Sequence, residues 1–230
     1  PIPFTTSTLQ QEASKALNFS TQKTMRIAQQ LYEGVEVKGH GTIGLITYLR
    51  TDSTRVADEA DAAARSFVKE HYGDNYVAEG EASAKNTGKI QDAHEAIRPT
   101  DISLTPVMVK ESLPRDLFRL YQLIWKRFTA SRMAPAVYET TSVKIHAGKH
   151  IFTTSASRLS FDGFMSVYVA SDDEGEKKQV IGAIESGMEL KLEELQPSQH
   201  FTQPPAHYTE ASLVKAMEEQ GIGRPSTYAP

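Results

Sequence analysis

The hydrophobic periodicity of this chain changes at Pro135, and this change constrains the fold more than any other feature. Before it, apolar residues recur at helical spacing over several long stretches. After it, residues 137–145 and 150–157 are rich in Thr, Val and Ile around an Ala147–Lys149 turn, a pattern typical of a β-hairpin. Helical and β segments are thus separated along the chain, which predicts an α+β fold.

Four helices are predicted before Pro135. They are expected over residues 7–18, 21–34, 56–71 and 115–133. Ser7 begins a capping-box pattern, Ser20 can cap the second helix and Gly34 can end it. Between the second and third helices, the apolar residues 43–49 predict a buried strand or extended segment that leads into a turn at Arg50–Thr54.

Less regular structure is predicted after the hairpin. Residues 161–169 could add a third strand, and the alternating residues 188–194 predict another. The stiff Pro204–Pro205 pair separates this region from a short helix over 209–220, which Gly221 ends. The chain does not begin with Met and stops just after Tyr228, so we expect it to be a fragment of a longer protein.

Charge is distributed unevenly. The net charge of −4 argues against a protein that simply coats nucleic acid. Residues 104–135, however, carry six basic and two acidic side chains, whereas residues 171–195 carry three basic and eight acidic ones. A polyanion such as DNA could therefore dock on the first segment and be repelled by the second.

Several classes of protein are excluded by composition. The absence of cysteine excludes disulfides, a thiol nucleophile and zinc–thiolate sites. No apolar run approaches the roughly 18 residues of a membrane span, and the first residues lack the apolar core of a signal peptide. We therefore expect a cytoplasmic protein that does not associate with membranes.

Tyr48 is the first candidate for chemistry, because it stands at the end of the apolar segment. Residues i and i+2 share a face of an extended chain, so Arg50 is expected beside the tyrosine hydroxyl. A tyrosine, whose ordinary pKa is about 10, needs about 4 kcal/mol of stabilisation to be a phenolate at neutral pH, more than one arginine typically supplies. A nucleophilic tyrosine would thus need more than Arg50, and a tyrosine that only packs remains the alternative.

A second polar cluster lies between Asp92 and Thr100. His94 and Arg98, predicted to be one helical turn apart, could hold a phosphate. A loop with solvated charges is the alternative. Asp92, His94 and Glu95 could also be imagined as metal ligands, but a second carboxylate cluster at a useful spacing is lacking.

A third motif, Gly221–Tyr228, follows the last predicted helix. Its glycines would let the backbone approach a phosphate, Arg224 could pair with that phosphate, and Ser226 and Thr227 offer hydroxyls. A structural turn would use the same glycines. The spacing differs from that of a Walker loop, and no Lys-Ser or Lys-Thr pair follows.

Taken together, these motifs resemble the type IA DNA topoisomerases, and they occur in the order found in that family. The Arg-Thr-Asp-Ser-Thr run after Tyr48 is similar to the bacterial topoisomerase I branch rather than to topoisomerase III or reverse gyrase. The resemblance covers essentially the whole chain. It rests on residues 3–13, 28–34, 44–54, 94–100, 208–215 and 221–228.

The resemblance implies a covalent mechanism. Tyr48 would attack a phosphodiester of single-stranded DNA, forming a 5′-phosphotyrosyl link and releasing a 3′-hydroxyl. A strand would then pass through the gap and the 3′-hydroxyl would reverse the reaction, so that negatively supercoiled DNA is relaxed without ATP. Arg50 would stabilise charge on the scissile phosphate, and His94 would hold a phosphate beside it. The phosphate-binding set would be completed by Arg98, Arg224, Ser226 and Thr227.

The resemblance also implies that part of the active site lies outside this chain. The family's Toprim domain, whose acidic cluster binds Mg²⁺, has no counterpart here, so we expect no metal site in these residues and no relaxation by the chain alone. By the same comparison, residues 1–134 resemble a helical tyrosine-bearing domain, 135–205 part of a β-rich arch, and 206–230 the start of a helical DNA-binding domain. The expected partner is single-stranded or negatively supercoiled DNA, bound by a monomer.

Three other functions remain as alternatives. A non-catalytic module could bind single-stranded DNA by stacking Tyr48 and Tyr228 on bases, without forming a covalent adduct. A different tyrosine transesterase, such as a relaxase or recombinase, would need a histidine triad or a dispersed arginine pattern, neither of which is found. The chain could also act only through interactions of its arch.

Overall fold

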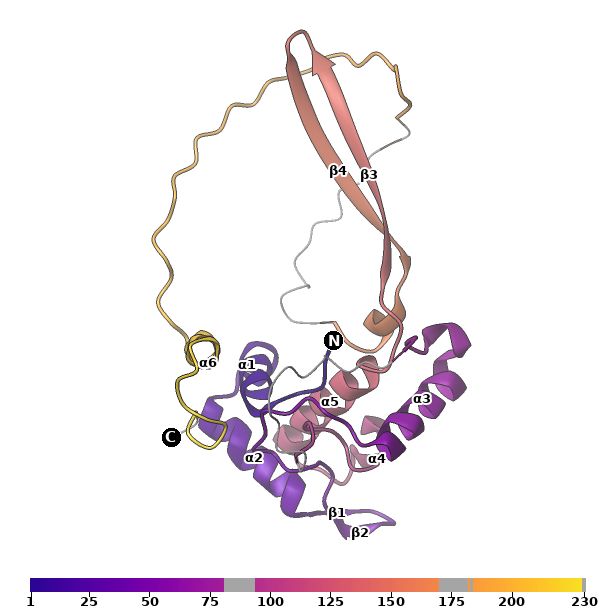
Figure 1. The fold of residues 1–230 in the computed structure, drawn as a ribbon, viewed down its shortest axis with the longest axis vertical. Helices are drawn as coiled ribbons and strands as arrows, with labels where there is room; N and C mark the ends of the chain where they lie inside the picture. Colours follow the sequence, from indigo (N-terminus) through magenta and orange to yellow (C-terminus); the bar gives the residue numbers. More distant parts are fainter. Residues whose placement is uncertain (81–93, 170–181, 183, 229–230) are drawn as a thin grey trace.

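The computed structural model describes residues 1–80, 94–169, 182 and 184–228, and it has two visibly different parts. A base of packed helices carries a long two-stranded hairpin that projects away from it (Figure 1). From the region of the hairpin tip, an extended segment returns to the base and ends in the last helix. The combination of helices and small antiparallel sheets confirms the predicted α+β fold.

The elements of the base are short to medium helices and one small sheet. They are α1 (Thr6–Leu17), α2 (Thr21–Glu33), β1 (Val35–Val37), β2 (Gly41–Ile43), α3 (Asp58–Tyr72), the 3₁₀ helix η1 (Asp74–Tyr76), α4 (Pro106–Val109), α5 (Arg115–Ala130) and, after the hairpin, α6 (Glu210–Glu219). The four helices predicted before Pro135 are therefore confirmed, with ends that differ by a few residues. The short α4 was not predicted.

The start of α1 differs from the prediction. Thr5, not Ser7, is the N-cap residue, and it forms a reciprocal capping box with Thr8. Ser7 is buried instead inside the first turn. At the other end, Asn18 adopts the left-handed conformation (φ 57°) that terminates many helices. As predicted, Ser20 caps the start of α2 and Gly34 caps its end.

The core of the base is built around α5. One face of this helix buries Leu120, Tyr121, Ile124 and Phe128, each at most 2% exposed. A hydrogen bond also joins this helix to the loop that precedes it. The indole Nε1 of Trp125 donates to the Ile102 carbonyl (2.9 Å). Its amphipathic sequence thus determines which side faces the core.

The hairpin consists of β3 (Val137–Ala147) and β4 (His150–Phe161). The strands are antiparallel, with Ala147 opposite His150 at the tip, so the predicted hairpin and its turn are confirmed. Most residues of both strands are exposed, and only a few reach intermediate burial. The hairpin is therefore held by its own ladder and by its root on the base.

Residues 161–169 were predicted to add a strand, and this prediction is wrong. The chain leaves β4 through the 3₁₀ helix η2 (Gly163–Ser166), and Tyr168 then packs into the base at 4% exposure. Gly163 makes this path possible, because it has φ +48° and an added Cβ would lie only 2.4 Å from the Ala134 carbonyl oxygen. Instead of a strand, these residues form a tight turn against Ala134 and Pro135, just before β3.

The strand predicted over 188–194 is also absent from the structure. These residues form an exposed, extended segment without a paired neighbour. The alternation of apolar residues was a genuine strand signal, but a strand needs a partner for its backbone hydrogen bonds. The sequence from Gly175 to Lys178 predicts a charged turn, and these residues lie outside the described part of the chain.

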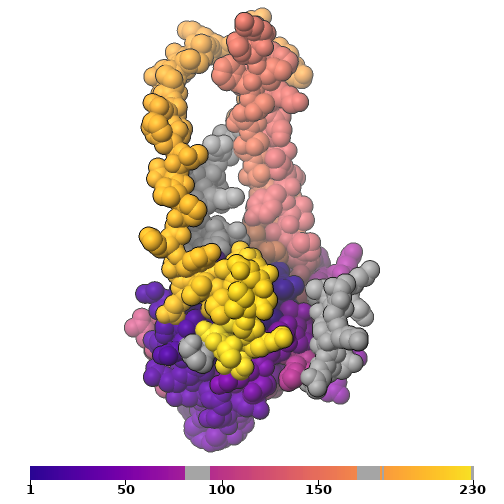
Figure 2. All heavy atoms as spheres, turned by 60° about the vertical axis from the view of Figure 1, so that its left-hand side comes forward, coloured from indigo at the N-terminus to yellow at the C-terminus, as the bar shows by residue number. Residues whose placement is uncertain are grey.

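The last helix returns the chain to the base. The short helix predicted before Gly221 is confirmed as α6, and its N-cap Thr209 forms a capping box with Ser212. It packs on α1, and its Glu210 carboxylate accepts a hydrogen bond from the Thr21 backbone N–H (2.8 Å) at the start of α2. Figure 2 shows this end of the chain lying against the helical base. No helix in the described part of the chain is long and apolar enough to cross a membrane.

Candidate active site

Tyr48 lies on an extended segment whose side chains alternate between buried and exposed. Leu49, Thr51 and Ser53 are at most 3% exposed, whereas Tyr48 is 44% exposed and Arg50 and Asp52 are also exposed. The alternation places the phenol, the guanidinium and a carboxylate on one outward face, as expected for positions i, i+2 and i+4. The predicted segment is therefore extended rather than a long regular strand, since β2 ends at Ile43.

The first residue of α1 fixes the segment after the tyrosine. The Thr6 hydroxyl donates a hydrogen bond to the Leu49 carbonyl (2.7 Å) and accepts one from the Thr51 N–H (2.8 Å). The Thr6 N–H in turn donates to the Thr51 carbonyl (2.9 Å). These bonds are buried and join positions more than forty residues apart in sequence, so Tyr48 and Arg50 project from a constrained backbone. Sequence reasoning did not identify Thr6.

The second motif fixes the segment on the other side. The Thr47 N–H donates to the Arg98 carbonyl (2.9 Å), and the Thr47 hydroxyl donates to the Ala96 carbonyl (2.7 Å). Ile46 and Pro99 form an antiparallel bridge next to these contacts. The first two sequence motifs are therefore neighbours in space, with their backbones paired directly beside Tyr48.

Arg98 does not have the geometry that the sequence predicted. His94 and Arg98 were expected one helical turn apart, but residues 94–100 are extended, because their backbone pairs with residues 45–47 and with Phe4. The Arg98 side chain is only 12% exposed, and its Nε and Nη2 atoms lie 2.9 and 2.7 Å from Glu95 Oε2. His94 is exposed, and Asp92 lies outside the described residues. In this structure Arg98 is thus engaged by Glu95 rather than open to a phosphate.

The third motif lies near the same face. Burial raises the pKa of Tyr228, the carboxylates of Glu218 and Asp52 raise it further, and the Arg224 guanidinium lowers it. Asp52 belongs to the exposed face of the Tyr48 segment, so the loop after α6 shares its electrostatic surroundings. The candidate residues Tyr48, Arg50 and Arg224 are all exposed.

The loop itself is a preformed turn. Gly221 and Gly223 have φ angles of +68° and +82°, which favour glycine. The Thr227 hydroxyl accepts a hydrogen bond from the Arg224 N–H (2.9 Å) and donates to the Arg224 carbonyl (3.1 Å). Thr227 therefore shapes the loop, although it is exposed like Ser226. This geometry is compatible with both interpretations of the glycines, a structural turn and a phosphate-binding loop.

Tyr32 is a neighbour of the candidate nucleophile that the sequence analysis missed. Its ring packs edge to face against that of Tyr48, with centroids 5.5 Å apart and an interplanar angle of 68°. The sequence places Tyr32 next to Glu33 at the end of α2, and the only hint was its place within the family motif at residues 28–34.

The basic segment 104–135 is less available to DNA than its composition predicted. Arg132 is 4% exposed, with its Nε atom 2.7 Å from Asp61 Oδ1. Arg127 donates hydrogen bonds to the Ile2 carbonyl (2.7 Å) and to the Tyr168 hydroxyl (3.0 Å). Arg127 and Arg132, two of the six basic residues of this segment, are therefore engaged in contacts within the fold.

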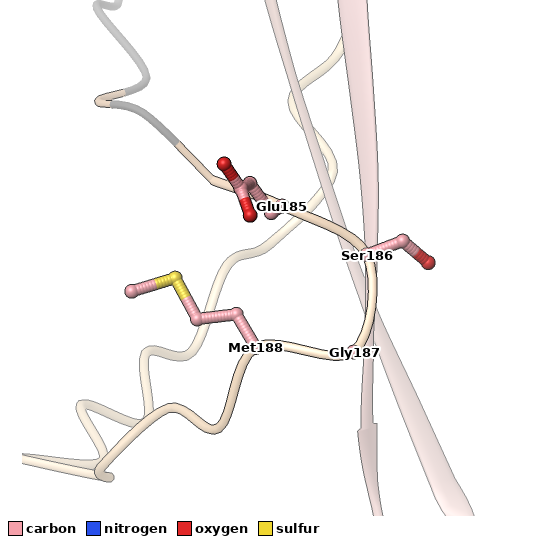
Figure 3. Close-up of a pocket in the computed structure, with 4 residues that line it drawn as sticks. All are labelled: Glu185, Ser186, Gly187 and Met188. Atoms are coloured by element: carbon pink, nitrogen blue, oxygen red, sulfur yellow. The ribbon is translucent and has the colours of Figure 1, made fainter.

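The most clearly formed hollows in the described part of the chain are not lined by Tyr48 or Arg50. Among the described residues, no group of three or more His, Asp or Glu side chains could hold a metal ion. The hollow lined by Glu185, Ser186, Gly187 and Met188 is a bend in the return segment (Figure 3), and only one charged side chain faces it. It offers none of the converging polar groups of a catalytic pocket.

Backbone pairing thus brings an exposed tyrosine, with an arginine on the same face, next to the polar motif at residues 94–100, an arrangement suited to work on a phosphodiester at the protein surface. The family model for DNA topoisomerase matches residues 1–230. The chain belongs to this family, in its bacterial type IA branch. Full-length topoisomerase I from Thermotoga maritima is 45% identical to it, with a TM-score of 0.81 over 100% of this chain. The match covers 36% of the Thermotoga protein, so this chain spans about a third of that length.

Proposed function

We propose that residues 1–230 supply the nucleophile and part of the DNA-binding surface of an ATP-independent type IA topoisomerase. The observation that carries the proposal is the exposed Tyr48 on a backbone that Thr6 and Thr47 hold from both sides. A nucleophile must meet its phosphate in a narrow range of geometries, so a fixed backbone with an accessible hydroxyl suits that role.

The proposed reaction is a reversible transesterification. The Tyr48 oxygen bonds to the phosphorus while the bond from phosphorus to the 3′ oxygen breaks. The phenol loses its proton, and the departing 3′ oxygen gains one and leaves as a hydroxyl. The new ester keeps the free energy of the phosphodiester, so religation by the 3′-hydroxyl needs no ATP. Arg50 would face the negative charge that develops on the phosphate. Arg224, Ser226 and His94 would contact neighbouring backbone phosphates.

Magnesium has no step in this proposal. The family resemblance implies acidic ligands for Mg²⁺ in a domain beyond these residues, and the described residues do not form such a site. When bound there, the ion would supply charge neutralisation for the phosphates.

We also propose the domain boundaries near residues 134 and 205, where the hairpin begins and the return segment ends.

A chimera tests the proposed function. Residues 1–230 would replace the matching segment of the Thermotoga maritima protein, and covalent adduct would be measured with an end-labelled single-stranded oligonucleotide. Tyr48→Phe should abolish the adduct while DNA affinity changes only a few fold, because a hydroxyl contact is worth about 1 kcal/mol. Tyr138→Phe, a change of a similarly exposed tyrosine on β3, is the matched control and should form normal adduct.

Two outcomes would contradict the proposal. Undiminished adduct from Tyr48→Phe would exclude this residue as the nucleophile. DNA binding without adduct, by a chimera that still carries Tyr48, would instead favour the non-catalytic binding module.

A further inference from the structure

The ring of Tyr48 rests against the ring of Tyr32, the penultimate residue of α2. The rings meet edge to face, an arrangement that aromatic pairs favour because the positive edge of one ring meets the negative face of the other. The two side chains are 44% and 40% exposed, so this contact sits at the surface rather than in the core. The fold does not need the contact to exclude water from its interior.

The backbone beneath the two rings is locked together. The Leu45 N–H donates a hydrogen bond to the Leu31 carbonyl (2.7 Å), joining the end of α2 to the segment that leads to Tyr48. At Gly44, an added Cβ would lie 2.6 Å from the Tyr32 carbonyl oxygen, so only glycine permits this close approach. Tyr32 is therefore held at a fixed place relative to the start of the Tyr48 segment.

The backbone of Tyr48 is fixed, but its side chain can still rotate about χ1 and χ2. Thr47 and Leu49 are both tied by hydrogen bonds, whereas a change of χ1 at Tyr48 would move its hydroxyl by several ångströms. Among the described residues, Tyr32 is the one whose aromatic ring packs on that of Tyr48. The contact thus favours one direction of the phenol before DNA arrives.

We propose that Tyr32 is a positioning residue for the nucleophile, whose ring orients the Tyr48 phenol toward the outward face that also carries Arg50. This inference rests on the proposed function. The ring of Tyr32 does the positioning and its hydroxyl is not required. Tyr32 acts on the rate of cleavage and not on DNA affinity.

The first test measures the contact in the chain itself. The aromatic ¹³C–¹H signals of Tyr48, assigned by their loss in Tyr48→Phe, should be displaced by the ring current of Tyr32. Tyr32→Phe should keep this displacement, and Tyr32→Leu should move the signals to the positions of an exposed tyrosine. Tyr48 signals that are the same in all three proteins would overturn the inference.

The second test measures chemistry in the chimera. The single-turnover rate of adduct formation should fall about three- to tenfold in Tyr32→Leu, the size expected for loss of an aromatic pair, while the dissociation constant for the oligonucleotide stays within twofold. Tyr32→Phe should restore the rate. Tyr138→Leu is the matched control for removal of an exposed tyrosine ring, and its rate should equal that of the unsubstituted chimera.

The outcomes separate this inference from the proposed function. If Tyr48→Phe forms no adduct and Tyr32→Leu forms it at the unchanged rate, the positioning role of Tyr32 is overturned while the proposed function stands. A rate that falls as far in Tyr32→Phe as in Tyr32→Leu would show that the hydroxyl matters, which also overturns it. If Tyr32→Leu melts at a lower temperature than the parent, Tyr32→Gln, which is compatible with a helix end, repeats the rate measurement in a folded protein.

Discussion

The helical base and the hairpin both carry large apolar side chains, but they bury them very differently. Along α5, Leu120, Tyr121 and Ile124 are fully buried. On β4, Ile151 and Phe152 remain 58% and 52% exposed. The base is therefore stabilised by its own core, whereas the hairpin is held by its ladder and by the turn at its root.

This difference explains where the candidate nucleophile is found. A two-stranded hairpin by itself is only marginally stable in water, so it could not hold a reacting group within the tolerance that phosphoryl chemistry needs. Tyr48 lies instead on the base, between segments tied to α1 and to residues 96–100. The well-packed part of the molecule carries the candidate nucleophile, and the exposed hairpin extends away from it (Figure 1).

A matched pair of phenylalanines should show the largest contrast. Phe128→Ala removes a ring that is 2% exposed and should lower the free energy of unfolding by about 3 to 5 kcal/mol. Phe152→Ala removes a ring that is 52% exposed and should change it by less than about 1 kcal/mol. Urea unfolding followed by fluorescence of Trp125, the single tryptophan, measures both. Equal losses would mean that the hairpin shares the core of the base.

The junction between the two parts should be the next most sensitive place. Gly163→Ala meets both a positive φ and the Ala134 carbonyl, and it should cost about 3 kcal/mol and disturb the hairpin root. Gly148→Ala at the hairpin tip has a similar φ of +61° but open space around it, so it should cost about 1 kcal/mol. Amide exchange of residues 134–138 and the unfolding curve would report both changes. Similar effects at the two glycines would contradict a tightly seated root.

The smallest expected effect depends on pH. Burial raises the pKa of Tyr168, which returns from the hairpin into the base, to about 12. The folded state therefore holds this proton more tightly than the unfolded chain, whose tyrosine loses it near pH 10. The resulting stabilisation, about 2 kcal/mol, is fully present below pH 10 and is lost as the pH rises toward 12. The urea midpoint of the parent should fall relative to that of Tyr168→Phe, which cannot titrate, as the pH rises through this range, and a constant difference between them would exclude the titration.

Much of the local structure could be predicted because it depends on neighbours in sequence. The bounds of α2 followed from a serine before it and a glycine after it, and the hairpin followed from β-branched residues around a glycine turn. The outward face of Tyr48 and Arg50 followed from the two-residue period of extended chain. The family followed from motifs whose order is a property of the sequence alone.

Other features were decided only when distant segments met. The predicted strand over 188–194 failed because alternation cannot supply a strand with a partner, and the one over 161–169 failed because Gly163 turns the chain against Ala134. Arg98 forms an ion pair with Glu95 in the extended backbone that residues 94–100 adopt when they pair with the Tyr48 segment. The sequence by itself thus determined the elements, their caps and the face on which the tyrosine lies, since these depend on local backbone preferences. Tertiary structure alone decided that Thr6 ties down Leu49 and that Tyr32 packs on Tyr48, because such contacts depend on how whole segments pack and leave no periodic signal in the chain.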